Sequence, residues 1–213
     1  MASLTFEASL PHPDDTDKLG ARLADAVSKE AGAVAGHGLA VRLEGNLGAG
    51  KTSLVRAMLR RLGFAGPVKS PTFSLVETYP VAGLTLNHFD FYRFEEPEEF
   101  EDAGFRDLFG PGFVSATEWT EKASPYVPDA DLVIELALEG LGRRAVLKGL
   151  TPLGEALVAH VYLDGGLAHG VLRAGAGVLV VVHDDAEAFQ REVRAVRAQM
   201  ALQQKRQRTV GRL

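Results

Sequence analysis

The strongest chemical pattern in this chain of 213 residues is the run Gly45–Thr52, with the sequence GNLGAGKT. It fits the phosphate-loop pattern G-x-x-x-x-G-K-[ST]. Glycines let the backbone curl so that successive N–H groups point at phosphate oxygens, and a helix that begins at Lys51 adds the positive end of its dipole. Lys51 can then reach the β- and γ-phosphates, and the Thr52 hydroxyl can bind Mg²⁺. The pattern therefore predicts a nucleoside triphosphate site.

Two carboxylates are candidates for the acidic partner that a phosphate-loop protein needs beside its metal. Asp90 ends an apolar segment predicted as a strand over 84–91. Glu118 precedes Trp119, the only tryptophan, in a strand predicted over 114–119. Solvated side chains at strand ends explain both residues equally well. The residues alone leave open whether either acid acts on a metal.

Other polar residues nearby allow a chemical and a structural interpretation. The run Ser70–Ser74, SPTFS, lies where GTPases keep the threonine that senses the γ-phosphate. A turn with exposed hydroxyls explains that run as well. His88 is expected to be a packed strand histidine. The acidic run Glu95–Asp102 is expected to be a solvated helix face and a poor metal cage, because Pro97 interrupts it.

The elements that must position these residues alternate between strands and helices. Strands are predicted over 4–10, 39–43, 84–91, 114–119, 132–138 and 143–150. The segment over 68–79 is predicted to be a loop that leads into one more strand. A first helix is predicted to begin at a cap formed by Asp14, Asp15 or Thr16 and to end near glycines 32 and 36. Further helices are predicted over 51–62 and 153–160, and another is predicted to begin near residue 95. This alternation favours an α/β fold around one sheet.

Composition bounds the class of protein. Hydrophobic residues make up 46% and charged residues 24%, and the net charge is −5, which argues against a globally basic nucleic-acid coat protein. Cysteine is absent, which excludes a disulfide scaffold, thiol catalysis and cysteine-based metal sites. The first twenty residues lack a signal-peptide pattern, and no apolar run is long enough to cross a membrane. We therefore expect a cytoplasmic protein that does not bind membranes.

The chain changes character near Asp164. Glycines crowd the segment that follows, a strand is predicted over 178–182, and a last helix is predicted after Asp185. Residues 191–213 hold seven basic side chains and one acid, Glu192. We therefore divide the chain into a domain over 1–163 and a C-terminal extension over 164–213. The basic tail either contacts the phosphates of a nucleic acid or is a solvated, frayed end.

Four segments in order carry a resemblance to a known family. They are LEGNLGAGKTSLVRAMLRRLG from 43, VKSPTFSLVETY from 68, HFDFYRFEEPEEFEDAGFRDLF from 88 and SATEWTEKASPYVPDADLVIEL from 115. Together they resemble the bacterial TsaE family, also called YjeE, over roughly residues 4–160. The resemblance implies a P-loop NTPase-like three-layer fold with a small mixed β-sheet. It also implies an ATPase that assists threonylcarbamoylation of the adenosine beside the tRNA anticodon, by resetting a complex of TsaD and TsaB.

The resemblance also implies roles for particular residues. Lys51 and Asp90 would be catalytic, with Asp90 ordering the attacking water or the metal's waters, and Thr52 and Glu118 would bind Mg²⁺. Arg143 is an alternative to Arg144 at the nucleotide edge. Phe91 stands where a leucine is common in the family. The implied nucleotide-binding residues are Thr16, Asn46, Leu47, Gly48, Ala49, Gly50, Lys51, Thr52, Ser53, Thr72, Trp119 and Arg144.

The predicted activity is transfer of the ATP γ-phosphoryl group to water, slow in isolation because no arginine finger is evident in the sequence. Three alternatives remain open. A small-molecule kinase would need an arginine-bearing lid, whereas the segment over 94–112 is acidic. A guanine-nucleotide switch would need an N-K-x-D motif, and the only asparagines are Asn46 and Asn87. A nucleotide-dependent binding scaffold would show no turnover even with partners.

Overall fold

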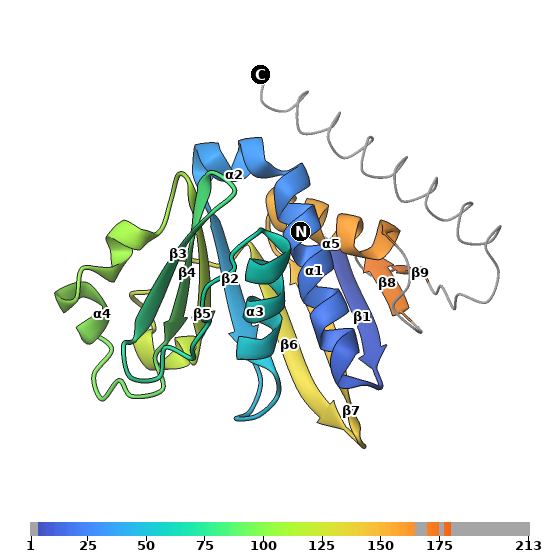
Figure 1. The fold of residues 1–213 in the computed structure, drawn as a ribbon, viewed down its shortest axis with the longest axis horizontal. Helices are drawn as coiled ribbons and strands as arrows, with labels where there is room; N and C mark the ends of the chain where they lie inside the picture. Colours follow the sequence, from blue (N-terminus) through green and yellow to red (C-terminus); the bar gives the residue numbers. More distant parts are fainter. Residues whose placement is uncertain (1–3, 165–169, 175–176, 180–213) are drawn as a thin grey trace.

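The computed structural model describes residues 4–164, 170–174 and 177–179 (Figure 1). Their strands form a sheet in the order β3-β4-β5-β2-β6-β7-β1-β8-β9. The strands are β1 (Leu4–Leu10), β2 (Leu39–Glu44), β3 (Val76–Val81), β4 (Leu84–Asp90), β5 (Phe113–Glu118), β6 (Leu132–Glu139), β7 (Gly142–Gly149), β8 (Gly170–Ala174) and β9 (Gly177–Leu179). The helices are α1 (Pro13–Lys29), α2 (Ala31–His37), α3 (Lys51–Arg61), α4 (Glu99–Asp102) and α5 (Pro152–Leu163), with 3-10 turns η1 (Phe105–Leu108) and η2 (Thr120–Ala123).

The centre of the sheet is parallel and its flanks are antiparallel. Strand β2 runs parallel to both β5 and β6, and β4 runs parallel to β5. The β3–β4 and β6–β7 hairpins and the pairs β1–β7 and β1–β8 are antiparallel. The predicted α/β class with a mixed sheet is therefore confirmed. Because β2, β4 and β5 end at one edge, residues just beyond their carboxyl ends lie close together.

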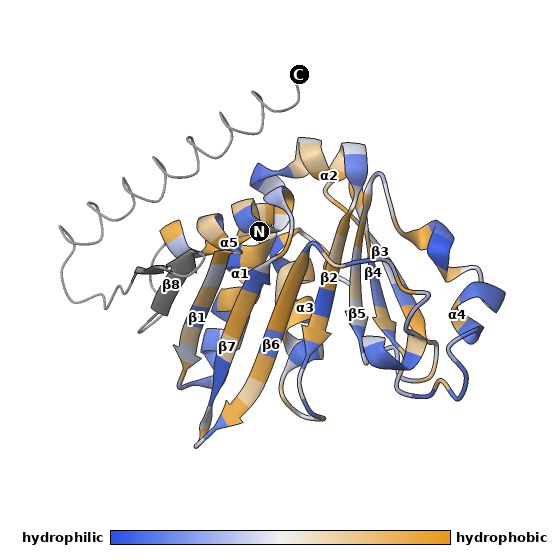
Figure 2. Cartoon of the chain, turned by 180° about the vertical axis from the view of Figure 1, so that it is seen from behind, coloured by the Kyte–Doolittle hydropathy of each residue, from blue (hydrophilic) through white to orange (hydrophobic). Residues whose placement is uncertain are grey.

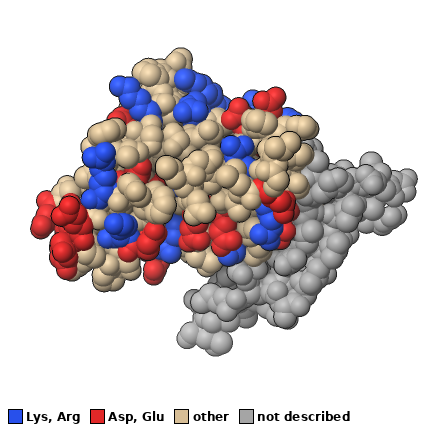
Figure 3. Space-filling view, turned by 90° about the horizontal axis from the view of Figure 1, so that it is seen from below, with Lys and Arg blue, Asp and Glu red and all other residues tan. Residues whose placement is uncertain are grey.

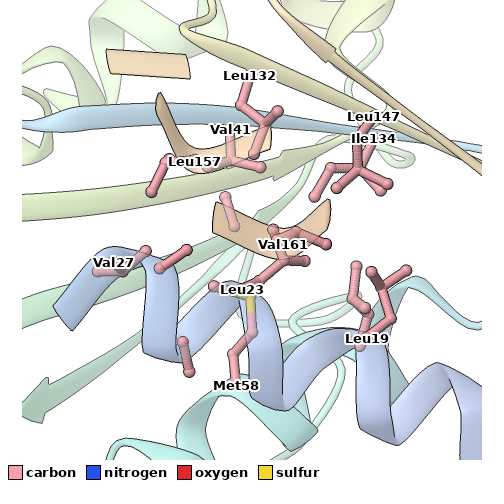
Figure 4. Close-up of a cluster of buried hydrophobic side chains, with 14 of the residues drawn as sticks. Leu19, Leu23, Val27, Val41, Met58, Leu132, Ile134, Leu147, Leu157 and Val161 are labelled. Carbon is pink, nitrogen blue, oxygen red and sulfur yellow. The ribbon is translucent and has the colours of Figure 1, made fainter. Parts of the chain in front are cut away.

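One face of the sheet carries the main core under α1, α3 and α5. Strand β1 alternates between buried and half-buried residues, which is the pattern of a strand with one covered face. Figure 4 shows side chains from the helices and the sheet meeting there, with Leu23 from α1 and Met58 from α3 opposite Ile134 of β6. Helix α1 packs directly on α3, since a Cβ at Gly20 would lie 2.6 Å from Ala57 Cβ.

The opposite face is covered unevenly. Seen from behind, strands β1, β7, β6 and β2 lie in front of the helices (Figure 2). Beside β4, a second core of phenylalanines packs around the segment that carries α4 and η1. Its fully buried members include Phe89, Phe91 and Phe100. Because side chains alternate along a strand, Phe89 enters this core while His88 and Asp90 point to the other face of β4.

Three local predictions need correction. Helix α1 begins at Pro13 rather than at a cap formed by Asp14, Asp15 or Thr16. Asp15 instead accepts a hydrogen bond from the backbone N–H of His12 at 2.9 Å. The hydrogen bond from Lys18 and that N–H hold the pKa of Asp15 below its usual range. The glycines expected to close α1 lie inside a second helix, α2, and strand β8 was not predicted.

The segment after Asp164 extends the same sheet, since β8 pairs with β1 and β9 pairs with β8. The strand predicted over 178–182 overlaps β9, and its last residues lie outside the described part of the chain. The predicted last helix and basic tail also lie outside it. The division into a domain over 1–163 and an extension over 164–213 stays a prediction. No described helix is long and apolar enough to span a bilayer.

Candidate functional site

The phosphate-loop pattern lies between the end of β2 and the start of α3, as its spacing predicts (Figure 1). Three glycines of the loop adopt positive φ, with values of 138° at Gly45, 80° at Gly48 and 108° at Gly50. A turn closes the loop, because the Ala49 N–H donates to the Asn46 carbonyl at 3.1 Å. These conformations favour glycine and give the curled backbone that a phosphate requires.

Lys51 is the buried cation of the loop. Its side chain is only 5% exposed. Its ammonium donates to the carbonyls of Gly45 and Asn46 at 2.6 and 3.2 Å. It also lies 3.5 Å from a carboxylate oxygen of Glu118 and 5.0 Å from the centre of a Trp119 ring. The lysine charge is therefore held inside the curl of the loop, with a single carboxylate as its ion-pair partner among the described residues.

Thr52 and Glu118 lie together although 66 positions separate them in the chain. The Thr52 hydroxyl donates to Glu118 Oε1 at 3.4 Å. A hydroxyl and a carboxylate are hard oxygen donors of the kind that Mg²⁺ prefers, with phosphates and water completing its shell. The described residues contain no group of three or more His, Cys, Asp or Glu side chains that could hold a metal ion without other ligands. The pair therefore fits a Mg²⁺ ion shared with a nucleotide.

Asp90 ends β4 directly beside Glu118 on β5, because the two residues are partners in the parallel register. Its Oδ2 accepts a hydrogen bond from the Thr72 hydroxyl at 2.8 Å, and its Oδ1 accepts one from the Tyr92 N–H at 3.0 Å. The Ser70 and Thr72 hydroxyls lie 2.9 Å apart. The loop over 70–75 is thus attached through Thr72 to the carboxylate predicted to order water.

Trp119 lies immediately after β5 in a left-handed conformation, with φ of 56°. Its ring contacts Tyr92 at 5.2 Å between centroids and faces the Lys51 ammonium. On the other side of the loop, a hollow of about 380 Å³ is lined by Glu44 and Glu135. Glu135 is paired with Lys148, whereas Glu44 has no cation partner among the described residues, so this hollow carries acidic side chains and the Lys51 side of the loop carries a cation.

A family model described as "Threonylcarbamoyl adenosine biosynthesis protein TsaE" matches residues 10–146. The chain belongs to the TsaE family. The matched range spans all of the site residues above, from the phosphate loop to Trp119.

Curated TsaE relatives agree with this assignment. The protein named "tRNA threonylcarbamoyladenosine biosynthesis protein TsaE" of Haemophilus influenzae is 43% identical over 119 residues, which cover 56% of this chain and 75% of that protein. The protein of the same name from Bacillus subtilis is 35% identical over 121 residues, covering 57% and 75%. The crystal structure of Bacillus subtilis YdiB superposes with a TM-score of 0.54 at 24% identity, covering 76% of this chain and 95% of that one. The structural likeness supports the P-loop fold.

Within the TsaE match, β7 places the two candidate arginines differently. The Arg143 guanidinium Nε donates to the Ala49 carbonyl of the phosphate loop at 2.7 Å. Arg144, the residue predicted to bind nucleotide, pairs with Glu7 of β1 at 2.7 Å, and this carboxylate raises the pKa of Arg144. Neighbouring residues of a strand face opposite sides of the sheet, so only one of them reaches the loop. The structure brings Arg143 to the site and leaves Arg144 away from it.

Thr16, predicted at the nucleotide edge, is 1% exposed and is the fourth residue of α1. Its hydroxyl has no hydrogen-bond partner in the part of the chain that the structure describes. Ser53 is half-buried in the first turn of α3. Asn87 is committed to the sheet, where it bonds the Thr78 hydroxyl and the Leu108 carbonyl. Of the two asparagines, only Asn46 lies at the TsaE phosphate loop.

Two features of the TsaE site were not predicted. His88, interpreted as a packed strand histidine, is buried but also bonds Glu118 at 2.8 Å. Arg93 stacks on the ring of Phe73 at 4.3 Å, which links the loop over 70–75 to the segment after β4. Position in the alternating β4 pattern places His88 on the same face as Asp90, and that signal was present in the sequence.

We expect the Gly45→Ala substitution to destabilise the protein by about 3 kcal/mol. Its φ is 138°, and an added Cβ would lie 2.2 Å from the Leu136 carbonyl oxygen, so β2 and β6 would have to separate. Gly48→Ala is the matched control, because its φ is 80° but nothing lies within 4 Å of the added Cβ. The control should cost about 1–2 kcal/mol. Urea unfolding measures both, and equal losses would contradict the expectation.

Proposed function

We propose that this chain binds ATP with Mg²⁺ at the loop Gly45–Thr52 and hydrolyses it as part of the machinery for tRNA threonylcarbamoyladenosine biosynthesis. The observation that carries the proposal is the buried Lys51 ammonium inside the curled loop, with Thr52 and Glu118 in contact beside it. Membership of the TsaE family supports the pathway. We further propose that the chain acts on a complex of TsaD and TsaB.

The residues divide the work of phosphoryl transfer. Loop N–H groups and Lys51 bind the phosphates and oppose the charge that develops between the β- and γ-phosphates. Thr52 and Glu118 would hold Mg²⁺, which would supply further positive charge opposite those phosphates. Asp90 would orient the attacking water or the waters around the metal site, and Thr72, which bonds Asp90, connects that carboxylate to the loop over 70–75. Trp119 packs beside the nucleotide.

A partner that covers the site fits the surface at the same edge of the sheet. Large apolar side chains are exposed on several loops there: Leu47 is 87% exposed in the phosphate loop, Phe73 is 84% exposed, and Leu141 is fully exposed on the β6–β7 hairpin. Viewed from this edge, much of the middle is uncharged, and acidic side chains gather toward the end that carries α4 (Figure 3). Exposed apolar side chains of this size support a protein interface.

The Arg143 guanidinium bonds the loop backbone and Arg93 stacks on Phe73, so both arginines have partners other than a phosphate. This supports slow hydrolysis by the isolated chain, because arginine that stabilises the transferring phosphoryl group accelerates such reactions by about 10³–10⁵. A partner that supplies a charge or reorders these loops would complete the site.

Reconstitution with purified TsaD and TsaB tests the proposal. We expect ATP turnover to be slow for the chain alone and to rise about tenfold or more with both partners and Mg²⁺, because the covered site excludes water and gains positive charge. Phosphate release measures the rate, and Thr52→Ala is the inactive control. Nucleotide binding without turnover in the full mixture would instead favour a binding scaffold. A phosphorylated small molecule in an ATP screen would favour a kinase.

A further inference from the structure

His88 is a fully buried polar residue that the proposed mechanism does not use. It lies on β4, the second strand from the β3 edge of the sheet, between Glu77 of β3 and Ala116 of β5, and its exposure is 0%. Histidine is seldom retained at such a position without a partner, because burying a polar group costs free energy unless it is hydrogen-bonded. Its contacts therefore indicate what the imidazole does there.

Among the described residues, the hydrogen bond of the imidazole is to the proposed metal ligand. His88 Nε2 lies 2.8 Å from Glu118 Oε1, and Nδ1 is buried with no partner in that part of the chain. A carboxylate accepts hydrogen bonds, so the Nε2–H group of His88 is the donor to Glu118. One ring nitrogen is left unsatisfied, which disfavours this residue on stability grounds alone.

Glu118 is held at both oxygens. Oε1 receives the His88 N–H at 2.8 Å and the Thr52 hydroxyl at 3.4 Å, and Oε2 lies 3.5 Å from Lys51. The bond from His88 is the shortest of the three. When a nucleotide binds, the Lys51 ammonium is expected to contact phosphate and the Thr52 hydroxyl is expected to contact the metal, so neither is free to hold Glu118. His88 is then the group that still fixes the carboxylate.

We propose that His88 is a positioning residue that orients Glu118 toward the Mg²⁺ position beside Thr52; this inference rests on the proposed function. Mg²⁺ demands near-ideal octahedral geometry, so a carboxylate that can rotate binds it less well. Hydrogen bonds to ligating side chains are worth about 10–100-fold in metal affinity. The bond from the imidazole supplies this orientation from a rigid strand rather than from a loop.

The test compares two substitutions of His88 by amide side chains, which differ in how far their N–H group extends. In His88→Gln the side-chain N–H group lies at about the reach of Nε2, and in His88→Asn it lies at about the reach of Nδ1. Fluorescence of Trp119, the only tryptophan, reports binding of β,γ-imido-ATP in a titration with Mg²⁺ and in one with EDTA. The ratio of the two dissociation constants measures the contribution of Mg²⁺. The Glu118→Gln variant gives the value of this ratio when the carboxylate that would bind Mg²⁺ is absent.

We expect His88→Asn to reduce the Mg²⁺ contribution about tenfold or more and His88→Gln to retain it within about threefold, with unchanged affinity in EDTA for both. His88→Leu replaces the asparagine variant in this comparison if that variant does not fold. If the unmodified chain responds to Mg²⁺ and the Mg²⁺ contribution is unaltered in His88→Asn or His88→Leu, the role of His88 is overturned and the proposed function is not. An unmodified chain that binds the analogue equally with and without Mg²⁺ overturns the proposed metal site as well.

Discussion

The Lys51→Ala variant should lose about 100-fold or more in kcat/KM for ATP hydrolysis, measured with TsaD and TsaB present. The ammonium lies inside the loop and is 5% exposed, so its charge acts at low dielectric where phosphate binds. Removal of one preorganised donor to developing charge typically costs about 10²–10³ in rate. Phosphate release at saturating Mg²⁺ measures the loss.

The matched control is Lys29→Ala, because Lys29 pairs with Asp164 at the far end of α1 and should leave turnover unchanged. Thermal unfolding separates lost chemistry from lost fold, since Lys51→Ala also removes the ion-pair partner of Glu118. Turnover within a few fold of the unmodified chain, in a folded Lys51→Ala variant, would exclude the loop as the site of hydrolysis.

The Phe91→Ala variant should lower the free energy of unfolding by about 3–5 kcal/mol. Phe91 is completely buried just beyond β4 and contacts four other aromatic rings, including Phe94 at 4.9 Å and Phe100 at 5.8 Å between centroids. Truncation leaves a cavity among the neighbouring rings, and these rings are packed too closely to move into it and fill it. Urea unfolding with a fitted m-value measures the change.

Two companions sharpen the Phe91 test. Phe91→Leu keeps most of the volume and should cost less than about 1.5 kcal/mol. Phe73→Ala removes an equally large ring that is 84% exposed and should change stability by no more than about 0.5 kcal/mol. A loss of similar size in Phe73→Ala and Phe91→Ala would contradict the second core.

The phosphate loop was predictable because its chemistry is local: glycines, lysine and threonine act within one strand–turn–helix unit. The proximity of Asp90 and Glu118 was partly predictable, since both end apolar strands. Which strands are neighbours is a property of the sheet, and only the parallel register of β4 and β5 sets the two acids side by side. The contact of His88 with Glu118 depends on the same register and was missed for the same reason.

Errors of prediction arose where local signals compete with packing. Gly32 and Gly36 indicate helix ends, yet they lie within α2, and nothing lies within 4 Å of a Cβ added to either, so the helix tolerates them on an open surface. The choice between Arg143 and Arg144 depends on which face of β7 turns to the loop. A one-residue change of register would reverse it, and no local pattern fixes that register.

The position of β1 determines when this protein can finish folding. Leu4 pairs with Gly149 and Leu10 with Arg143, so β1, which precedes the phosphate loop in the chain, lies inside the sheet beside β7, which follows the other site segments. Such distant pairing is slow because a long stretch of chain must be closed before any contact forms. A nascent chain that has completed the phosphate loop still lacks β7, and with it the arginine that bonds Ala49. A finished nucleotide site therefore requires synthesis of the chain at least as far as β7.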